Sequence, residues 1–318
     1  MKPERPANLR PDAAFFSIGW AALHRDILDP DEDLMVMFKS SPYGAVSHSH
    51  ADQNSFAIMK GGKALAIPGG RRYPIHGSPF HTKYTQQTMA HNAILVNGHG
   101  QINRSGSATG ALTAFESRNR LAYACGDASK CYGDLLTRCK RHVLMIRPSI
   151  VCVVDDLESR EPADFQWLLH AHQPFELDEL GQTLISRKDG EAMTVRLITT
   201  DGFSFSQTND WPMSPKEGFP KTTAAEPAKQ WHFTAATRAK TSSRRIAAVM
   251  LVHVKGKAPD CEIRGPENGV LEIRSESGGT TATVRICLTT SQVGLAPILE
   301  AQCRAPSGEA ETISVDGK

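Results

Sequence analysis

The segment SHSHADQNSFAIMKGGKALAIPGG, residues 47–70, contains two short apolar runs separated by a glycine pair. The runs Ser55–Met59 and Ala64–Ile67 have the length and composition of β-strands, and Gly61-Gly62 lies between them as in a hairpin loop. The segment therefore predicts two antiparallel strands joined by a tight turn.

Short apolar runs and turn residues alternate in the same way on both sides of this hairpin. The 25 glycines and 19 prolines leave few uninterrupted windows in which a long amphipathic helix would form. We therefore expect an all-β protein, a large antiparallel β-sandwich of stacked sheets with few short helices. Further strands are predicted at Trp20–Leu23, Leu34–Phe38, Asn92–Val96, His142–Ile146, Ile150–Val154, Phe165–His170, Met193–Ile198, Ile246–His253, Val270–Ile273 and Thr280–Leu288.

The chain of 318 residues is long enough for one large β-domain with short extensions. Residues 1–14 are polar and rich in proline, as in an interdomain linker, and the domain itself is predicted to span residues 15–295. Residues 296–318 are rich in Ala, Glu, Ser and Gly, which predicts a weakly ordered tail. Within the domain, the longest loops are expected at Asp201–Lys229 and Lys255–Asn268.

Charge and hydropathy argue against two classes of partner. Lysine and arginine number 36 against 34 acidic residues, and the charges are dispersed, so the chain lacks the basic face that neutralises a nucleic-acid backbone. No apolar run approaches the roughly 18 residues that a membrane-spanning helix needs. We therefore expect neither nucleic acid nor a membrane as a partner.

The N-terminal sequence MKPERPANLRPDAAFF has charges and prolines where an export signal has an apolar core. The seven cysteines are irregularly spaced without a C-x-x-C pair, which argues against zinc-ribbon and thioredoxin motifs and is typical of buried thiols in a reducing compartment. We therefore expect a cytoplasmic protein, or a periplasmic or cell-envelope protein if the chain is a fragment of a longer exported enzyme.

Histidines are concentrated in one region of the chain. If the segment before Phe56 is extended, His48, His50, Asp52 and Asn54 point to one face. Such a row can bind a metal through neutral imidazole nitrogens, or can hold a carboxylate substrate by hydrogen bonds. Half of the 12 histidines fall in this region, namely His48, His50, His76, His81, His91 and His99.

A cupin, which is a metal-binding β-barrel, shares the H-x-H pair and the flanking glycines with this region. The ligand chemistry does not match, because Asn54 stands where a glutamate ligand is usual and Tyr73 stands where a third histidine is expected. A cupin-like metal protein is therefore the lesser alternative.

The better match is to the C-terminal β-domain of the heparinase II/III-like polysaccharide lyases. SHSHADQNSF at 47–56 and AHNAILVNGHGQ at 90–101 resemble the His-x-His-x-Asp and Ala-His-Asn motifs of that family, in the same order. The intervening ALAIPGG and GSPFH resemble its oligoalginate lyase-like branch. Weaker similarity in RHVLMIRPSIVCVVDDL and FQWLLHAHQPFEL extends the resemblance over most of residues 13–180.

The resemblance implies β-elimination on a uronic-acid-containing oligosaccharide or polysaccharide, alginate-like or heparin-like. The reaction removes the proton α to a uronate carboxylate and then expels the 4-linked sugar. It requires that the carboxylate be neutralised, that a base take the proton, and that an acid protonate the leaving oxygen. Imidazole, amide and phenol side chains suit these roles.

The resemblance also implies site residues. His48 is the catalytic candidate, which would line the sugar site and neutralise or position the carboxylate. His50 and His91 match positions that hold a metal in several relatives, and the expected ion is zinc. Neighbouring residues that are candidates for substrate binding, without an assigned role, are Gln53, Asn54, His81 and Tyr84.

The metal set departs from the family at one position. Relatives with a metal commonly have an aspartate downstream of the second histidine in a V-D-P-G-like turn, and Ile67 stands at that position in this chain. Isoleucine cannot ligate, so His50 and His91 would need Asp52 or water to complete a tetrahedral set. The sequence therefore leaves both a zinc site and a metal-free site open.

Family members usually carry an N-terminal α/α-toroid domain, which supplies the asparagine, histidine and tyrosine that do much of the proton transfer. No part of this sequence resembles that domain. We therefore expect a carbon–oxygen lyase of which this chain holds only the β-domain half of the active site, with a separate toroid domain or subunit as a partner. The alternative is a non-catalytic carbohydrate-binding β-sandwich or a truncated fragment.

Several other polar and aromatic residues are predicted to be structural. Asp155-Asp156 is interpreted as a turn that ends a strand, and His170 and His172 as histidines satisfied within the sandwich. Tryptophans can stack on sugars, but each of the four is predicted to lie in the core, namely Trp20, Trp167, Trp211 and Trp231.

Overall fold

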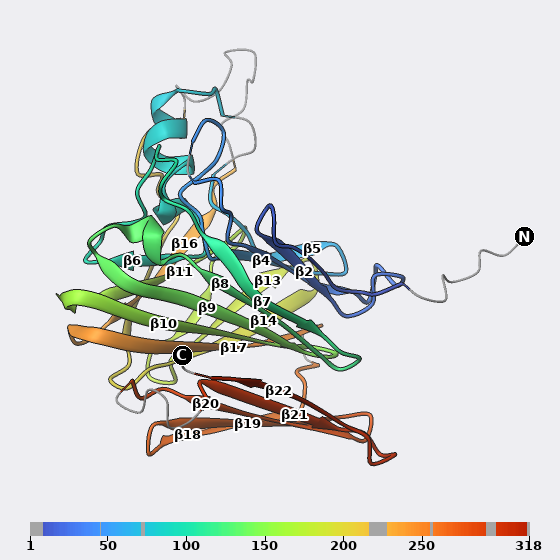
Figure 1. Ribbon diagram of the computed structural model, residues 1–318. Helices are drawn as coiled ribbons and strands as arrows, with labels where there is room; N and C mark the ends of the chain where they lie inside the picture. The colour runs from blue at the N-terminus through green and yellow to red at the C-terminus, as the bar shows by residue number, and fades with distance from the viewer. Residues whose placement is uncertain are drawn as a thin grey trace, which may run out of the picture.

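The strands of the protein are stacked in layers, as the computed structural model shows (Figure 1). The structure describes residues 9–44, 46–70, 74–215, 228–254, 257–290 and 297–316. These ranges contain 22 strands in four antiparallel sheets, together with three single helical turns. The prediction of an all-β sandwich of stacked sheets is confirmed. None of the helical turns in these ranges is long and apolar enough to span a bilayer.

The strands are grouped into four sheets, which we name by position. The N-terminal sheet has the order β1 (Ala13–Phe15), β2 (Trp20–His24), β3 (Leu34–Lys39), β4 (Ser55–Lys60) and β5 (Lys63–Ala66). The central sheet has the order β12 (Glu176–Asp178), β13 (Thr183–Lys188), β14 (Glu191–Ile198), β17 (Thr241–Val254), β10 (Ile150–Ala163), β9 (Leu136–Ile146), β8 (Leu121–Asp127) and β7 (Ala111–Ser117). The four-stranded sheet has the order β15 (Phe203–Thr208), β16 (Trp231–Thr237), β11 (Phe165–Ala171) and β6 (Ile94–Val96). The C-terminal sheet has the order β18 (Cys261–Glu267), β19 (Val270–Ser277), β20 (Thr280–Cys287), β21 (Leu299–Arg304) and β22 (Ala310–Val315). The helical turns are η1 (His81–Thr85), η2 (Thr88–Ala90) and η3 (Ser129–Tyr132).

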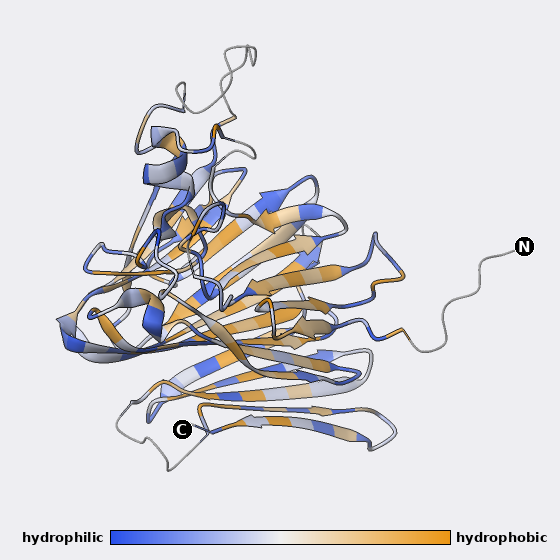
Figure 2. Cartoon of the chain, turned by 45° about the horizontal axis from the view of Figure 1, so that its top comes forward, coloured by the Kyte–Doolittle hydropathy of each residue, from blue (hydrophilic) through white to orange (hydrophobic). Residues whose placement is uncertain are grey.

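The central sheet is the middle layer, because its strands are apolar on both faces. On one face, Val143 and Val153 join a core with Phe38 of the N-terminal sheet and Phe165 of the four-stranded sheet. On the other face, a second core joins the central sheet to the C-terminal sheet, and Val154 lies in it. Figure 2 shows the hydrophobic residues concentrated on the strands of these layers.

The prediction that residues 296–318 form a weakly ordered tail is wrong for β21 and β22, which are strands of the C-terminal sheet. In β21, Leu299, Ala301 and Cys303 are buried and alternate with more exposed residues, so this strand closes the second core. In the same way, β18 and β15 lie within segments that were predicted to be loops. Residues 1–8 of the predicted linker-like segment lie outside the described residues.

The composition of the outer face of the C-terminal sheet explains why β18, β21 and β22 were not predicted as strands. Arg264, Glu272, Arg285 and Glu300 are successive cross-strand neighbours, so basic and acidic side chains alternate across the sheet. Such a polar face lowers the mean hydropathy of each strand, so β18, β21 and β22 were missed in the sequence, whereas β19 and β20 of the same sheet were predicted.

The strand order excludes the cupin alternative. A cupin is a jelly roll of eight strands in two sheets, whereas the described ranges form four sheets of five, eight, four and five strands. Tyr73, which was compared with a cupin ligand, lies outside the described residues.

Acid is expected to destabilise the sandwich through His142 on β9, whose Nδ1 lies 2.7 Å from the Tyr123 hydroxyl oxygen. Burial lowers the pKa of His142 to about 4, against about 6.5 for an unfolded chain. Between these values the unfolded chain binds a proton that the folded protein does not. We therefore expect the free energy of unfolding to fall by about 3 kcal/mol as the pH falls from 6.5 to 4.

Urea unfolding followed across this pH range measures the effect. His142→Gln removes the titrating group, so its stability should decline less steeply with acid than that of the unsubstituted protein. Equal slopes for the two proteins would contradict the assignment to His142.

Candidate functional site

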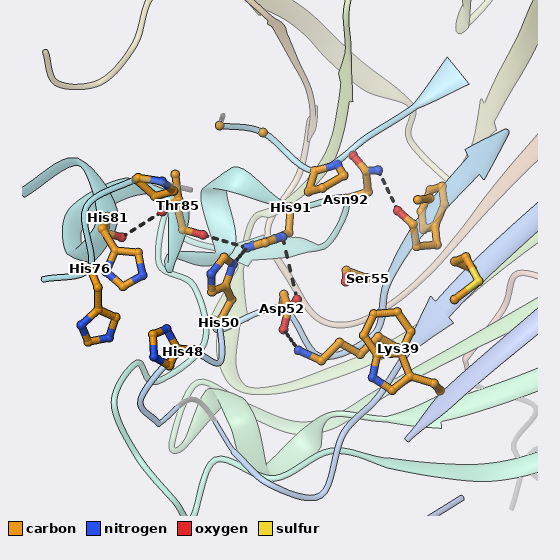
Figure 3. Close-up of a pocket in the computed structure, with 18 residues that line it drawn as sticks. Lys39, His48, His50, Asp52, Ser55, His76, His81, Thr85, His91 and Asn92 are labelled. Atoms are coloured by element: carbon orange, nitrogen blue, oxygen red, sulfur yellow. Dashed lines mark hydrogen bonds and ion pairs between the residues drawn. The ribbon is translucent and has the colours of Figure 1, made fainter. Parts of the chain in front are cut away.

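A cavity of about 660 Å³ lies beside the N-terminal sheet (Figure 3). One wall consists of apolar side chains from the strands, including Trp20, Met37 and Ala57. The opposite wall consists of polar side chains from the loops that follow β3 and β5. This polar wall includes five of the six clustered histidines, namely His48, His50, His76, His81 and His91.

The segment that carries His48 and His50 is not extended. Residues 47–53 form turns and bends, β4 begins only at Ser55, and both Ser47 and Asn54 have positive φ, 55° and 61°. The prediction that four alternate side chains share a face is therefore wrong. His48, His50 and Asp52 line the cavity, whereas Asn54 does not.

Polar side chains from the segment that precedes His91 hold this loop in place. Gln86 Nε2 donates to the carbonyl oxygens of Ser47 at 2.8 Å and Ser49 at 3.2 Å. Thr88 Oγ1 donates to the carbonyl oxygen of Ala51 at 2.8 Å. These bonds fix the backbone of the loop, which has no regular secondary structure of its own.

Two predicted substrate-binding residues make their hydrogen bonds within the protein. Gln53 is buried, and its side-chain Oε1 accepts a hydrogen bond from the Ser41 backbone N at 2.5 Å. Its backbone N donates to Gln101 Oε1 at 2.9 Å, and Gln101 Nε2 donates to its carbonyl oxygen at 2.7 Å. Asn54 Nδ2 donates to the carbonyl oxygens of Gly126 and Cys139 at 3.2 and 3.0 Å. Neither Gln53 nor Asn54 lines the cavity, so both act as ties between the loop and the sheets.

Arg141 on β9 joins the two histidine segments to the central sheet. It is fully buried, and its Nη1 donates to the carbonyl oxygens of Asn54 at 2.7 Å and Asn92 at 2.6 Å. Its Nε and Nη2 donate to the two carboxylate oxygens of Asp155 at 2.7 and 2.9 Å. Asp155 therefore lies inside β10, and the prediction of a strand-ending turn at that position is wrong. One guanidinium thus anchors both segments that carry the cavity histidines.

Within the described residues, His50, Asp52 and His91 form a group of three potential metal ligands, with one ligand atom of each lying within 4.8 Å of the others. His91 Nε2 lies 3.1 Å from the Thr85 carbonyl oxygen, to which it donates, and 3.3 Å from His50 Nδ1. His91 Nδ1, which keeps its lone pair, is 4.0 Å from Asp52 Oδ2. The other oxygen of Asp52 accepts a hydrogen bond from the Lys39 ammonium group. Asp52 thus places a carboxylate beside the two histidines, in a chain where Ile67 stands at the position of the family's aspartate.

Burial sets the protonation of these ligands. It lowers the pKa of His91 to about 4 and also lowers the pKa of His50. Both imidazoles are therefore neutral near pH 7, which is the state that binds a metal ion. The group fits a divalent cation in ligand type, charge and protonation.

Three further imidazoles continue the polar wall toward solvent. The ring centroids of His48 and His76 are 4.3 Å apart, and those of His76 and His81 are 4.9 Å apart (Figure 3). The Gly77 backbone N donates to His81 Nδ1 at 3.1 Å, so the neutral ring carries its proton on Nε2. Burial lowers the pKa of His81, which keeps the ring in this neutral form near pH 7.

Tyr84, the remaining predicted substrate-binding residue, lies behind the cavity wall. Its hydroxyl oxygen is 3.2 Å from His232 Nδ1, and burial raises the pKa of this phenol. Gly69 lines the cavity in front of it, and a Cβ at residue 69 would lie 2.5 Å from the Tyr84 hydroxyl oxygen. The absence of a side chain at Gly69 is therefore what leaves room for the phenol at this wall.

The sequence did not assign a role to several residues that shape the site. His76 belongs to the histidine cluster, and that clustering is the one signal that points to it. The other residues contact positions far away in the chain, so no local sequence pattern indicates them. Arg141 and Asn54, for example, are 87 positions apart. These other residues are Lys39, Gln86, Thr88 and Arg141.

Comparisons with known proteins agree with this architecture. A family model described as heparinase II/III-like, C-terminal, matches residues 7–280. The fold is similar to that of a solved heparinase III, with a TM-score of 0.69 and 13% identity over 96% of this chain and 42% of the other. It is also similar to the heparan sulfate lyase HepC from Pedobacter heparinus, with a TM-score of 0.68 and 16% identity over 100% of this chain and 44% of the other.

The chain thus spans less than half the length of these two solved proteins. At such identities the structural similarity establishes the fold alone. Among curated protein sequences, none matches this chain.

Proposed function

The chain belongs to the family of heparinase II/III-like C-terminal domains, and from this premise we propose that it forms the β-domain half of a polysaccharide lyase active site. The proposed reaction is β-elimination on a uronic-acid-containing glycan of the alginate or heparin type. One observation carries the proposal, namely that five histidines form one wall of a single cavity.

The reaction places three demands on a site. The C–H bond α to the uronate carboxylate breaks, its electron pair forms a carbon–carbon double bond, and the bond to the 4-linked oxygen breaks as that oxygen takes up a proton. The carboxylate must be neutralised to make the proton on its α carbon acidic. A base must take that proton, and an acid must give a proton to the leaving oxygen. We assign the task of neutralising or positioning the substrate carboxylate to His48, which is exposed and lines the cavity.

His81 is assigned to hold the substrate by hydrogen bonding. Its Nδ1 already accepts a hydrogen bond from Gly77, so its Nε2–H is the group left to donate to a sugar oxygen. The remaining proton transfers are assigned to a separate domain or subunit, the toroid partner that the family resemblance implies. The extra length of the heparinase III and HepC chains supports this assignment.

We also propose that His50, Asp52 and His91 hold a divalent cation, with zinc as the expected ion. Bound at this site, the ion would supply a fixed positive charge beside the polar wall. The protein's own contribution is to keep both imidazoles neutral by burial and to leave Asp52 Oδ2 available while Lys39 occupies Oδ1.

The ultraviolet absorbance of an unsaturated uronate tests the proposed reaction. The chain is incubated with oligoalginate and with heparin-type oligosaccharides, alone and together with the separately produced toroid domain of a relative. We expect the absorbance to rise when both halves are present. His48→Ala is then expected to lower the rate by about 10²- to 10³-fold, because it removes a group that stabilises negative charge on the substrate.

His99→Ala is the matched control, because His99 is an exposed histidine of the same cluster that does not line the cavity. The control should retain the full rate. Absence of any absorbance change across these glycans in all combinations would refute the lyase proposal. Oligosaccharide binding that His48→Ala weakens, without any turnover, would instead support a carbohydrate-binding module.

A further inference from the structure

The apolar wall of the cavity belongs to the outer face of the N-terminal sheet. Ala22, Met37 and Ala57 are cross-strand neighbours on β2, β3 and β4, and Met37 and Ala57 line the cavity. Trp20 lies on β2 beside this group and also lines the cavity. The prediction that Trp20 lies in the core is wrong, because 38% of its surface is exposed.

Trp20 is part of a row of side chains that crosses four strands. The register pairs Phe15 with Trp20, Trp20 with Lys39, and Lys39 with Ser55. Directly paired residues share one face of a sheet, and adjacent strands lie about 4.8 Å apart. The indole is therefore two strands, or about 10 Å, from Ser55, where the loop that carries His48 and His50 ends.

The charge along this row is already compensated. The Lys39 ammonium group pairs with Asp52, and both side chains are mostly buried. Trp20, Met37 and Ala57, which line this part of the cavity, have uncharged and mainly apolar side chains. A ligand group that lies over Trp20 is therefore bound by contact area and not by charge.

We propose that Trp20 is a stacking platform for a second sugar ring of the substrate. This ring is adjacent to the sugar whose carboxylate is held by the polar wall, called the histidine wall below. This inference rests on the proposed function and adds a second subsite of different chemistry to the same cavity. The occupant is a pyranose ring of the same acidic glycan, because platform and histidine wall line one continuous cavity. The carbon-bound hydrogens of a pyranose face pack on an indole, while its hydroxyl groups remain free to bind water.

Binding measured by calorimetry on the full chain tests the platform. The probes are an alginate tetrasaccharide and a single uronate unit. We expect Trp20→Ala to weaken tetrasaccharide binding by about tenfold and to change binding of the single unit by less than about twofold. Trp20→Phe should retain most of the affinity, because an aromatic face is kept.

Phe16→Ala is the matched control, since Phe16 lies on the same β1–β2 hairpin with 51% of its surface exposed and does not line the cavity. The control should bind the tetrasaccharide as the unsubstituted protein does. A dimer that Trp20→Ala dissociates, seen by sedimentation, would show that a second copy covers this face and would overturn the platform.

The remaining outcomes separate this inference from the proposed function. If His48→Ala weakens tetrasaccharide binding and Trp20→Ala does not, the platform is overturned and the proposed site is retained. If the unsubstituted protein binds neither alginate nor heparin-type tetrasaccharides, both are overturned.

Discussion

Arg141→Met is expected to lower the free energy of unfolding by about 3–5 kcal/mol. The substitution leaves the Asp155 carboxylate buried without its partner, and it removes the donor to the carbonyl oxygens of Asn54 and Asn92. Each of these losses costs free energy because no water reaches the freed groups. Urea unfolding at neutral pH measures the change.

Two further variants separate the charge pair from simple packing. Arg141→Lys keeps a positive charge but cannot form the bidentate fork, so it should recover only part of the lost stability. Arg264→Met is the matched surface control, because this arginine is exposed on the C-terminal sheet, and it should change stability by less than about 0.5 kcal/mol. An Arg141→Met protein within about 1 kcal/mol of the unsubstituted protein would contradict the anchoring role.

The second large effect concerns the metal. Protein purified without chelators is expected to hold about one equivalent of zinc, and His91→Ala is expected to lose nearly all of it, because two ligands do not retain the ion. Asp52→Asn should lower the zinc content less, since an amide oxygen keeps the shape of the carboxylate but not its charge. Metal analysis of the three proteins gives the result directly.

Stability provides an independent readout for the same site. Because the ion would tie the loop before β4 to the segment after η2, chelation should lower the midpoint of thermal unfolding, and added zinc should restore it. His99→Ala should behave as the unsubstituted protein does. A metal-free protein that is equally stable with and without zinc would reject the site.

The strand pattern and the order of the two histidine motifs were sufficient to predict the fold class and the family. Strands with alternating or continuous apolar residues, such as Leu34–Phe38 and Ile150–Val154, form where they were expected. In the C-terminal sheet, whose outer face carries alternating charges, β19 and β20 were predicted, whereas β18, β21 and β22 were not. Periodicity therefore predicted β9, β10, β14 and β17 of the central sheet but missed β7, β8, β12 and β13 of the same sheet.

The candidate site was predictable in composition but not in geometry. The motifs correctly brought together His50, Asp52 and His91, which come from distant parts of the chain. The conformation of residues 47–54 depends on Gln86 and Thr88, and the support beneath it depends on Arg141. Such long-range hydrogen bonds leave no local pattern in a single sequence. Gln53 and Asn54, which were predicted at the sugar, make hydrogen bonds to the scaffold and do not line the cavity.

The position of the C-terminal sheet has a practical consequence for attaching the protein to a surface. This sheet lies against the face of the central sheet opposite the N-terminal sheet, whose strands form the apolar wall of the cavity (Figure 1). A cysteine-directed fluorophore or a biotin placed at the exposed Ser277, beside the β19–β20 turn, would therefore leave the cavity open to long glycans. A sensor chip prepared in this way presents the histidine wall to solution, whereas coupling through the β1–β2 hairpin would cover the face that carries Trp20.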